Sequence, residues 1–137
     1  MAKISFRLVM PERELVNVDA DMVVVPGIEG DFGAMHGHAP LISIVRPGVL
    51  EVIQGSKVEQ RFMVVGGFAE VTPERCTVLA DEATPLEQVT ADQLAERQRA
   101  AERDLVDAAT DAEKAEAQKA ISVAKDLQRA QAFYAGR

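Results

Sequence analysis

Aromatic residues are scarce in this chain of 137 residues, and tryptophan is absent. Phenylalanine and tyrosine make up only 4% of the residues, although hydrophobic residues account for 47%. A core must therefore be built from valine, isoleucine, leucine, methionine and alanine. Branched aliphatic residues favour β-sheets and alanine allows helices to approach closely, so we expect both kinds of packing in this chain.

Cysteine is nearly absent as well. Because Cys76 is the only one, an internal disulfide and a cluster of thiolate metal ligands are excluded. A lone cysteine fits a reducing compartment. A thiol nucleophile would need an activating neighbour, and none is recognisable around Cys76, which lies in a strand-like apolar segment. We expect a packing residue there, and we predict no catalytic residue.

A basic net charge and long apolar runs are also missing. The formal net charge is −7 and lysine and arginine form no cluster, which excludes the usual basis for binding nucleic acid or an anionic membrane surface. No stretch approaches the roughly 18 apolar residues that span a bilayer, and the N-terminus lacks a segment of signal-peptide length. We expect a soluble chain that reaches a membrane only through a protein partner.

Up to residue 85 the apolar residues follow the two-residue period of β-strands. Alternating residues mark a first strand over 4–10, and all six prolines and eight of the nine glycines precede residue 86. Further strands are predicted at 22–25, 41–45, 49–53, 58–65, 68–71 and 76–80, with hairpin turns at 54–57 and 72–75. Short strands with frequent turns are typical of an antiparallel sandwich or barrel.

After residue 85 the composition becomes that of a helix. Residues 86–135 contain no glycine or proline and are rich in strong helix formers. Thr90 with Gln93, and Thr110 with Glu113, match the capping box that begins a helix. The pattern predicts helices over 91–108 and 111–134, joined so closely that they must run antiparallel.

The predicted seam between these helices is mostly alanine. On the first helix it comprises Leu94, Ala101, Leu105 and Ala108, and on the second Ala117, Ala120, Ile121, Ala124, Leu127 and Tyr134. An alanine seam buries little apolar area, so the hairpin should be weakly held. The sequence as a whole predicts an α+β chain, with an N-terminal antiparallel β-sandwich over 1–85 followed by a C-terminal antiparallel α-helical hairpin over 86–137.

Three features are candidates for chemistry. His36 and His38 form a pair that zinc could bind, but a third ligand is needed and would have to come from Glu29 or Asp31, so we favour loop histidines and no metal site. The glycine-rich segment 27–33 matches no nucleotide-binding fingerprint and is predicted to be a turn-rich loop outside a sheet. The cations of the second helix either form a solvated face or contact an acidic partner.

Several separated motifs stand in an order that is informative. They are Glu29-Gly30-Asp31-Phe32-Gly33, Gly37-His38-Ala39-Pro40-Leu41, Arg46-Pro47-Gly48, Gly66-Gly67-Phe68-Ala69-Glu70-Val71 and Val78-Leu79-Ala80-Asp81. In this order and spacing, the chain resembles the epsilon subunit of bacterial F-type ATP synthases. The resemblance covers residues 4–83 and continues more loosely through the helical tail.

The resemblance implies a non-catalytic subunit without cofactors, peripheral on the cytoplasmic face of the bacterial inner membrane. Its sandwich would bind the γ subunit and the c-ring, so that proton-driven rotation reaches the catalytic head. Its hairpin would be able to extend and obstruct ATP hydrolysis. The implied c-ring-facing residues are Glu29, Gly30, Asp31 and Phe32. The implied γ-facing residues are His38 and Ser43. The implied contacts with β subunits are Lys114, Lys119, Lys125 and Arg129.

One departure concerns nucleotide. Family members that bind ATP carry an acidic residue and an arginine at the start of the first helix, and Thr90 and Gln93 stand at those positions here, which makes ATP binding doubtful. A stand-alone nucleotide-sensing module is the second hypothesis, and this departure argues against it. A third is a small sandwich enzyme using His36, His38 and Asp31, for which the sequence offers no nucleophile.

Overall fold

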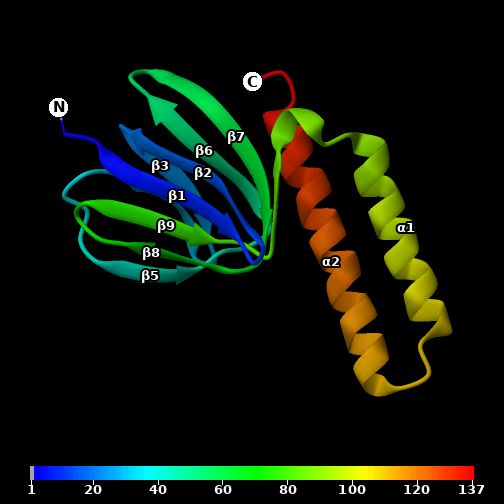
Figure 1. The fold of residues 1–137 in the computed structure, drawn as a ribbon. Coiled ribbons are helices and arrows are strands. Elements are labelled where there is room, and N and C mark those ends of the chain that lie inside the picture. Colours follow the sequence, from blue (N-terminus) through cyan, green and yellow to red (C-terminus); the bar gives the residue numbers. More distant parts are fainter. Residues whose placement is uncertain (1) are drawn as a thin grey trace. The chain divides into compact units, whose positions relative to one another are not determined.

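The computed structural model describes residues 2–137. The chain divides into two compact units, one ending at Leu86 and the other beginning at Glu87. Figure 1 shows that the first unit is made of strands and the second of two long helices. In the part of the chain that is described, no helix is both long and apolar enough to cross a membrane.

The first unit is a sandwich of two five-stranded sheets. Sheet A has the order β2 (Arg13–Ala20), β1 (Ile4–Met10), β9 (Arg75–Leu79), β8 (Phe68–Val71) and β5 (Leu41–Ile44). Sheet B has the order β10 (Glu82–Pro85), β7 (Lys57–Val65), β6 (Gly48–Gln54), β3 (Met22–Gly27) and β4 (Gly30–Ala34). All pairs are antiparallel except β1 with β9, which run parallel.

The core lies between the sheets and is built from alternate residues of the strands. In β1 the side chains of Ile4, Phe6 and Leu8 are fully buried. Val23 and Val25 of β3 belong to the same cluster. One face of each strand is therefore shielded from water, as the two-residue period predicted. The predicted fold class, a β-sandwich followed by a helical hairpin, is confirmed.

Three strands were not predicted from the sequence. In β2 only Val16 and Ala20 are buried, so its apolar signal is weak. The prediction of a loop outside the sheet over 27–33 is wrong, because β3 and β4 pair there as a hairpin. A Cβ on Gly27 would lie 2.9 Å from the carbonyl oxygen of Gly30. Glycine at this position therefore permits a close approach of two strands. The third unpredicted strand is β10.

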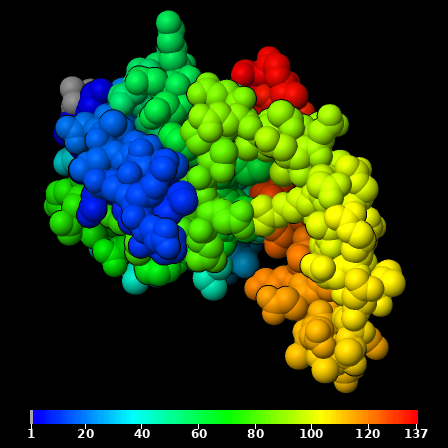
Figure 2. Space-filling model, turned by 45° about the vertical axis from the view of Figure 1, so that its right-hand side comes forward, coloured from blue at the N-terminus to red at the C-terminus, as the bar shows by residue number. Residues whose placement is uncertain are grey.

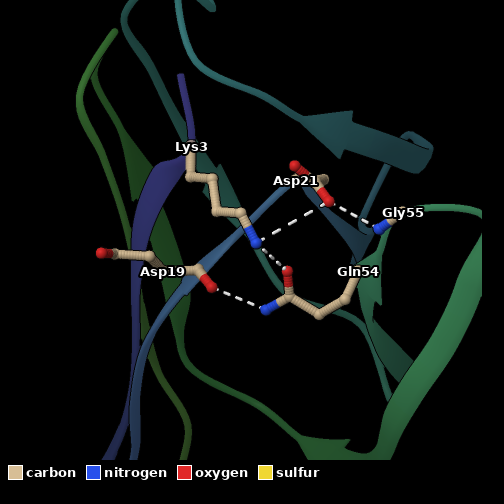
Figure 3. Close-up of polar contacts among 5 residues, drawn as sticks. All are labelled: Lys3, Asp19, Asp21, Gln54 and Gly55. Carbon is tan, nitrogen blue, oxygen red and sulfur yellow. Dashed lines mark hydrogen bonds and ion pairs between the residues drawn. The ribbon is translucent and has the colours of Figure 1, made fainter. Parts of the chain in front are cut away.

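A polar cluster links the two sheets at the β6–β7 turn (Figure 3). The Lys3 ammonium donates to the side-chain carbonyl of Gln54 at 2.7 Å and lies 3.9 Å from the Asp21 carboxylate. The Gln54 amide donates to the carbonyl oxygen of Asp19 at 2.6 Å, and the backbone N–H of Gly55 donates to Asp21 at 2.5 Å. These bonds connect strand β2 of sheet A to the β6–β7 hairpin of sheet B.

A short 3₁₀ turn (Leu86–Gln88) spans the boundary between the units. The second unit holds the two predicted helices, α1 (Ala91–Asp107) and α2 (Asp111–Tyr134). Both predicted capping boxes are present, with Thr90 accepting from the N–H of Gln93 and Thr110 from that of Glu113. The predicted end of α1 is one residue too long, because Ala108 is the C-cap and has an extended backbone.

The helices pack along a seam of small residues, and Figure 2 shows the yellow end of α1 beside the orange start of α2. The buried seam residues are Leu94, Ala101, Ala117, Ala124 and Leu127. Ala120 was also predicted there but is exposed. The seam includes a hydrogen bond of 2.6 Å, in which the Gln128 amide donates to the side-chain carbonyl of Gln98. Polar contacts thus accompany a small apolar interface.

Candidate functional site

The segment 29–32, expected to face a partner, begins at the tip of the β3–β4 hairpin. Ile28 and Glu29 form the turn, and the side chain of Ile28 is 59% exposed. Gly30, Asp31 and Phe32 belong to β4, so the description of this segment as a loop is wrong. Asp31 lies opposite Pro26 in the register. Phe32 is half-buried and packs against the core.

Asp31 is bound by an arginine that sequence reasoning left without a role. One guanidinium nitrogen of Arg46, Nη2, lies 2.5 Å from Asp31 Oδ1. The other, Nη1, donates to the carbonyl oxygen of Gly27 at 2.7 Å. The motifs containing Asp31 and Arg46 are therefore in direct contact, although fifteen residues separate them in the sequence.

The predicted γ-facing residue His38 lies beside the predicted c-ring-facing residue Phe32. Their ring centroids are 6.3 Å apart. Nδ1 of His38 lies 2.6 Å from the carbonyl oxygen of Ala39, which can only accept a hydrogen bond. Among residues 2–137, no group of three or more histidine, cysteine, aspartate or glutamate side chains is arranged to hold a metal ion.

Strand β5 is the edge of sheet A and presents aliphatic side chains outward. Ser43 pairs with the buried Ala69 and donates its hydroxyl to the carbonyl oxygen of Ile44 at 3.0 Å. Its neighbours Ile42 and Ile44 alternate to the opposite face and are 70% and 60% exposed. On β5 the two isoleucines are therefore the most exposed of the aliphatic side chains, whereas Ser43 is half-buried.

These isoleucines belong to a larger exposed apolar surface, which we call the apolar corner. Ile44 pairs with Phe68, which pairs with Leu79, so the three side chains form a row across β5, β8 and β9. The backbone N–H of Ile28 donates to the carbonyl oxygen of Ile44 at 2.8 Å. The apolar corner thus comprises Ile28, Ile42, Ile44, Phe68 and Leu79. Sequence reasoning missed it because an apolar run such as residues 41–45 reads as a buried strand.

The comparison with known proteins shows the family of this chain. The family model described as the β-sandwich domain of the ATP synthase delta/epsilon chain matches residues 3–86. The ATP synthase epsilon chain of Paramagnetospirillum magneticum is 53% identical over 109 residues, which cover 80% of this chain and 82% of the relative. This chain belongs to the ATP synthase epsilon chain family.

Other relatives and solved structures agree with this family. The ATP synthase epsilon chain of Rhodospirillum rubrum is 52% identical over 107 residues, covering 78% of this chain and 80% of that one. A chain in the Euglena gracilis mitochondrial ATP synthase, in a structure of OSCP/F1/c-ring, superposes with a TM-score of 0.78 at 23% identity over 95% of this chain and 82% of that one. A chain of the Tetrahymena thermophila central stalk/c-ring gives 0.72 at 21% identity, over 94% and 96%. At these identities the structures establish a common fold.

The helical hairpin of this family member carries the four cations expected to contact β subunits. Lys114, Lys119 and Lys125 are exposed, and Arg129 pairs with Asp126 at 2.7 Å. At about 3.6 residues per turn, Lys114, Lys125 and Arg129 fall on one side of α2 and Lys119 falls on another. The structure therefore groups three of the four cations, one of which is already paired within the helix.

Acidic residues surround the loop end of the hairpin. A hollow of about 420 Å³ lies between the helices there and is lined by four alanines and by the carboxylate residues Asp104, Asp107, Glu113 and Glu116. On α1, hydrogen bonds from Arg103 and Arg99 hold the pKa of Glu96 below its usual range. The loop end of the hairpin is therefore acidic, and the cationic side of α2 is confined to the positions of Lys114, Lys125 and Arg129.

Proposed function

We propose that this chain is a non-catalytic rotor subunit of an F-type ATP synthase, coupling proton-driven rotation of the c-ring to ATP synthesis in the catalytic head. Membership of the epsilon chain family supports the role. The Euglena and Tetrahymena structures are of assemblies named for the F1 head, the central stalk and the c-ring. In this proposal the chain is peripheral on the cytoplasmic face of the bacterial inner membrane and is attached through the complex.

The apolar corner is the observation that carries the assignment of partners. Exposed contiguous apolar side chains mark protein interaction sites, and Ile28, Ile42 and Ile44 are each more than half exposed. We assign β5 and the apolar corner, together with His38 and Ser43, to the γ subunit. We assign the adjoining turn and strand, Glu29 to Phe32, to the c-ring. The two partner sites then meet at one corner of the sandwich.

A charge placed in the apolar corner tests this assignment. Ile44→Asp should weaken binding to purified γ by at least about tenfold, because the carboxylate would be buried without a partner in the interface. The measurement is titration calorimetry with full-length chains. Val58→Asp is the matched control, since Val58 is exposed on β7 outside the apolar corner. Equal affinities for both variants would remove the apolar corner from the γ interface.

The hairpin is proposed to be an inhibitory tail that contacts β subunits through Lys114, Lys119, Lys125 and Arg129. Exposed ion pairs contribute only about 0–1 kcal/mol each, so the inhibition should be modest and should weaken as salt screens the charges. The test is ATP hydrolysis by the reconstituted head with the full chain or with a chain lacking residues 90–137. Equal rates at low salt would exclude an inhibitory tail.

A nucleotide-sensing hairpin is the alternative, and the start of α1 argues against it. The side chains of Thr90 and Gln93 are engaged with each other's backbone N–H groups, at 3.1 Å and 3.0 Å, in the capping box. They supply neither the acidic residue nor the arginine that the ATP-binding members carry. We expect no retention of ATP by the purified chain in equilibrium dialysis, and saturable retention would restore the alternative.

A further inference from the structure

Arg46 occupies the point where the chain passes from one sheet to the other. β5 ends at Ile44 in sheet A and β6 begins at Gly48 in sheet B. The backbone N–H of Arg46 donates to the carbonyl oxygen of Pro26 at 2.9 Å. An isolated bridge also pairs Val45 with Gly27. The crossover is therefore attached to strand β3 through the backbone.

The guanidinium of Arg46 extends this attachment to both strands of the β3–β4 hairpin. Nη1 reaches Gly27, the last residue of β3, and Nη2 reaches Asp31 in β4, at 2.7 Å and 2.5 Å. A planar guanidinium can hold two acceptors in a fixed relation, which a single ammonium cannot do. The two bonds together form what we call the Arg46 clamp.

The β3–β4 hairpin needs such support. β4 is a five-residue edge strand that contains Gly30 and Gly33, and glycine weakens a strand interior. A two-stranded hairpin alone has little stability. Strand β3 pairs with β6 over Met22–Val24, and beyond that point the hairpin is hydrogen-bonded to the crossover residues 44–46. A force applied at Ile28 and Glu29 is therefore resisted by the contacts with the crossover. The backbone bonds hold β3 and the turn, whereas the Arg46 side chain also holds β4.

We propose that Arg46 is a positioning residue that holds the turn at Ile28–Glu29 rigid against the β5–β6 crossover. This proposal rests on the proposed function, in which Glu29 and the start of β4 contact the c-ring, and β5 with the apolar corner contacts γ. A force that the c-ring applies to the turn is then transmitted through the Arg46 clamp to β5, the strand that contacts γ. Exposed ion pairs contribute little to the free energy of folding, so the effect of the clamp is on local stiffness.

Hydrogen exchange of the isolated full-length chain tests the clamp without any partner. Arg46→Gln should raise the exchange rates of the amides in residues 28–32 by about tenfold, as expected when charge-assisted bonds that limit a local opening are lost. Amides of β1 and β6 should be unchanged. Arg46→Lys should give an intermediate rate, because an ammonium can keep only one of the two bonds well. Unchanged rates at residues 28–32 in Arg46→Gln would overturn the clamp.

A matched control variant removes a similar ion pair elsewhere in the sandwich. Arg7 Nε lies 2.6 Å from Glu14 across β1 and β2, and the two side chains are 49% and 39% exposed, against 39% and 44% for Arg46 and Asp31. Arg7→Gln should leave exchange at residues 28–32 unchanged. Asp31→Asn should raise it by less than Arg46→Gln does, because Nη1 still holds Gly27.

The coupling role is tested in the reconstituted complex. Arg46→Gln should retain wild-type affinity for γ but lose part of the ATP synthesis driven by a proton gradient, whereas Arg7→Gln should lose none. Faster exchange with unimpaired synthesis would overturn the positioning role. If the wild-type chain bound neither γ nor the c-ring, the proposed rotor function would be wrong. The hydrogen-exchange experiment would still show whether the Arg46 clamp exists.

Discussion

At the scale of single residues, burial determines what Cys76 can do. Its side chain is fully buried in β9, and burial raises the pKa of the thiol to about 12. The thiol is therefore protonated at neutral pH and is a poor nucleophile, because the thiolate is the reactive form. The prediction that Cys76 is a packing residue is confirmed.

The raised pKa predicts a loss of stability at high pH. An exposed thiol in the unfolded chain releases its proton near about pH 8.5, whereas the folded chain retains it up to about 12. The contribution to stability is complete below the unfolded pKa and is lost progressively above it. Between pH 7.5 and 10, the free energy of unfolding should fall by about 2 kcal/mol more in the wild type than in Cys76→Ala. Urea unfolding of both chains at both pH values checks this, and parallel pH profiles would contradict it.

Two glycines with positive φ should differ in their tolerance of alanine. A Cβ on Gly67, with φ +92°, would lie 1.8 Å from the carbonyl oxygen of Leu79, whereas a Cβ on Gly55, with φ +63°, meets no atom within 4 Å. Gly55→Ala should cost about 1–2 kcal/mol, which is the backbone penalty alone. Gly67→Ala should cost at least about 3 kcal/mol, because the β8–β9 pair must also move. Thermal unfolding compares the two, and equal losses would show that the sheet can absorb the clash.

At the scale of secondary-structure elements, the hairpin combines good helices with a weak interface. Both helices begin with complete capping boxes, each contributing about 1 kcal/mol to helix stability. The interface between the helices depends on alanines and on the bond between Gln98 and Gln128. The helices can therefore persist after they separate, which suits an element proposed to have two arrangements.

Replacing the glutamine pair should stabilise the packed hairpin. Apolar groups of similar shape in place of both partners avoid an unsatisfied amide and add apolar contact. Gln98→Leu combined with Gln128→Leu should slow hydrogen exchange along the seam and, under the proposed function, reduce inhibition of ATP hydrolysis. Gln128→Leu alone is the control, since it leaves the Gln98 amide without its partner. Stronger inhibition of ATP hydrolysis by the double variant would contradict the proposal that the packed hairpin is the non-inhibitory arrangement.

At the scale of the whole molecule, the two units have separate cores. The core cluster of the sandwich contains residues from Ile4 to Ala83, and the buried residues of the hairpin lie between Leu94 and Leu127. A unit with its own core can in principle fold alone.

A fragment of residues 1–85 should therefore fold and bind γ. Domains of this size are only marginally stable, so a lower melting temperature than that of the full chain is expected. Circular dichroism reports the folding, and calorimetry with γ compares the affinity with that of the full chain. A fragment that remains unfolded would show that the sandwich depends on the hairpin and that the boundary at residue 85 is misplaced.

The sequence by itself determined the elements with strong local signals. Alternating residues marked β1, and the capping boxes at Thr90 and Thr110 marked both helices, because capping and periodicity involve neighbours in the chain. The glycine and proline content also located the change from strands to helices. Motif order was sufficient for the family, since several separated motifs in register are specific.

Only the tertiary structure decided which of these residues meet. The contact of Arg46 with Asp31 and Gly27, and the row of Ile44, Phe68 and Leu79, arise from strand pairing between distant segments. Strand β4 was mistaken for a loop because the glycines of segment 27–33 were interpreted as turn signals, whereas Gly27 permits a close approach of two strands. Pairing between distant strands depends on the packing of the whole core, which no local pattern records. For that reason the sequence identified the motifs separately, and the folded chain brings them together at one corner of the sandwich.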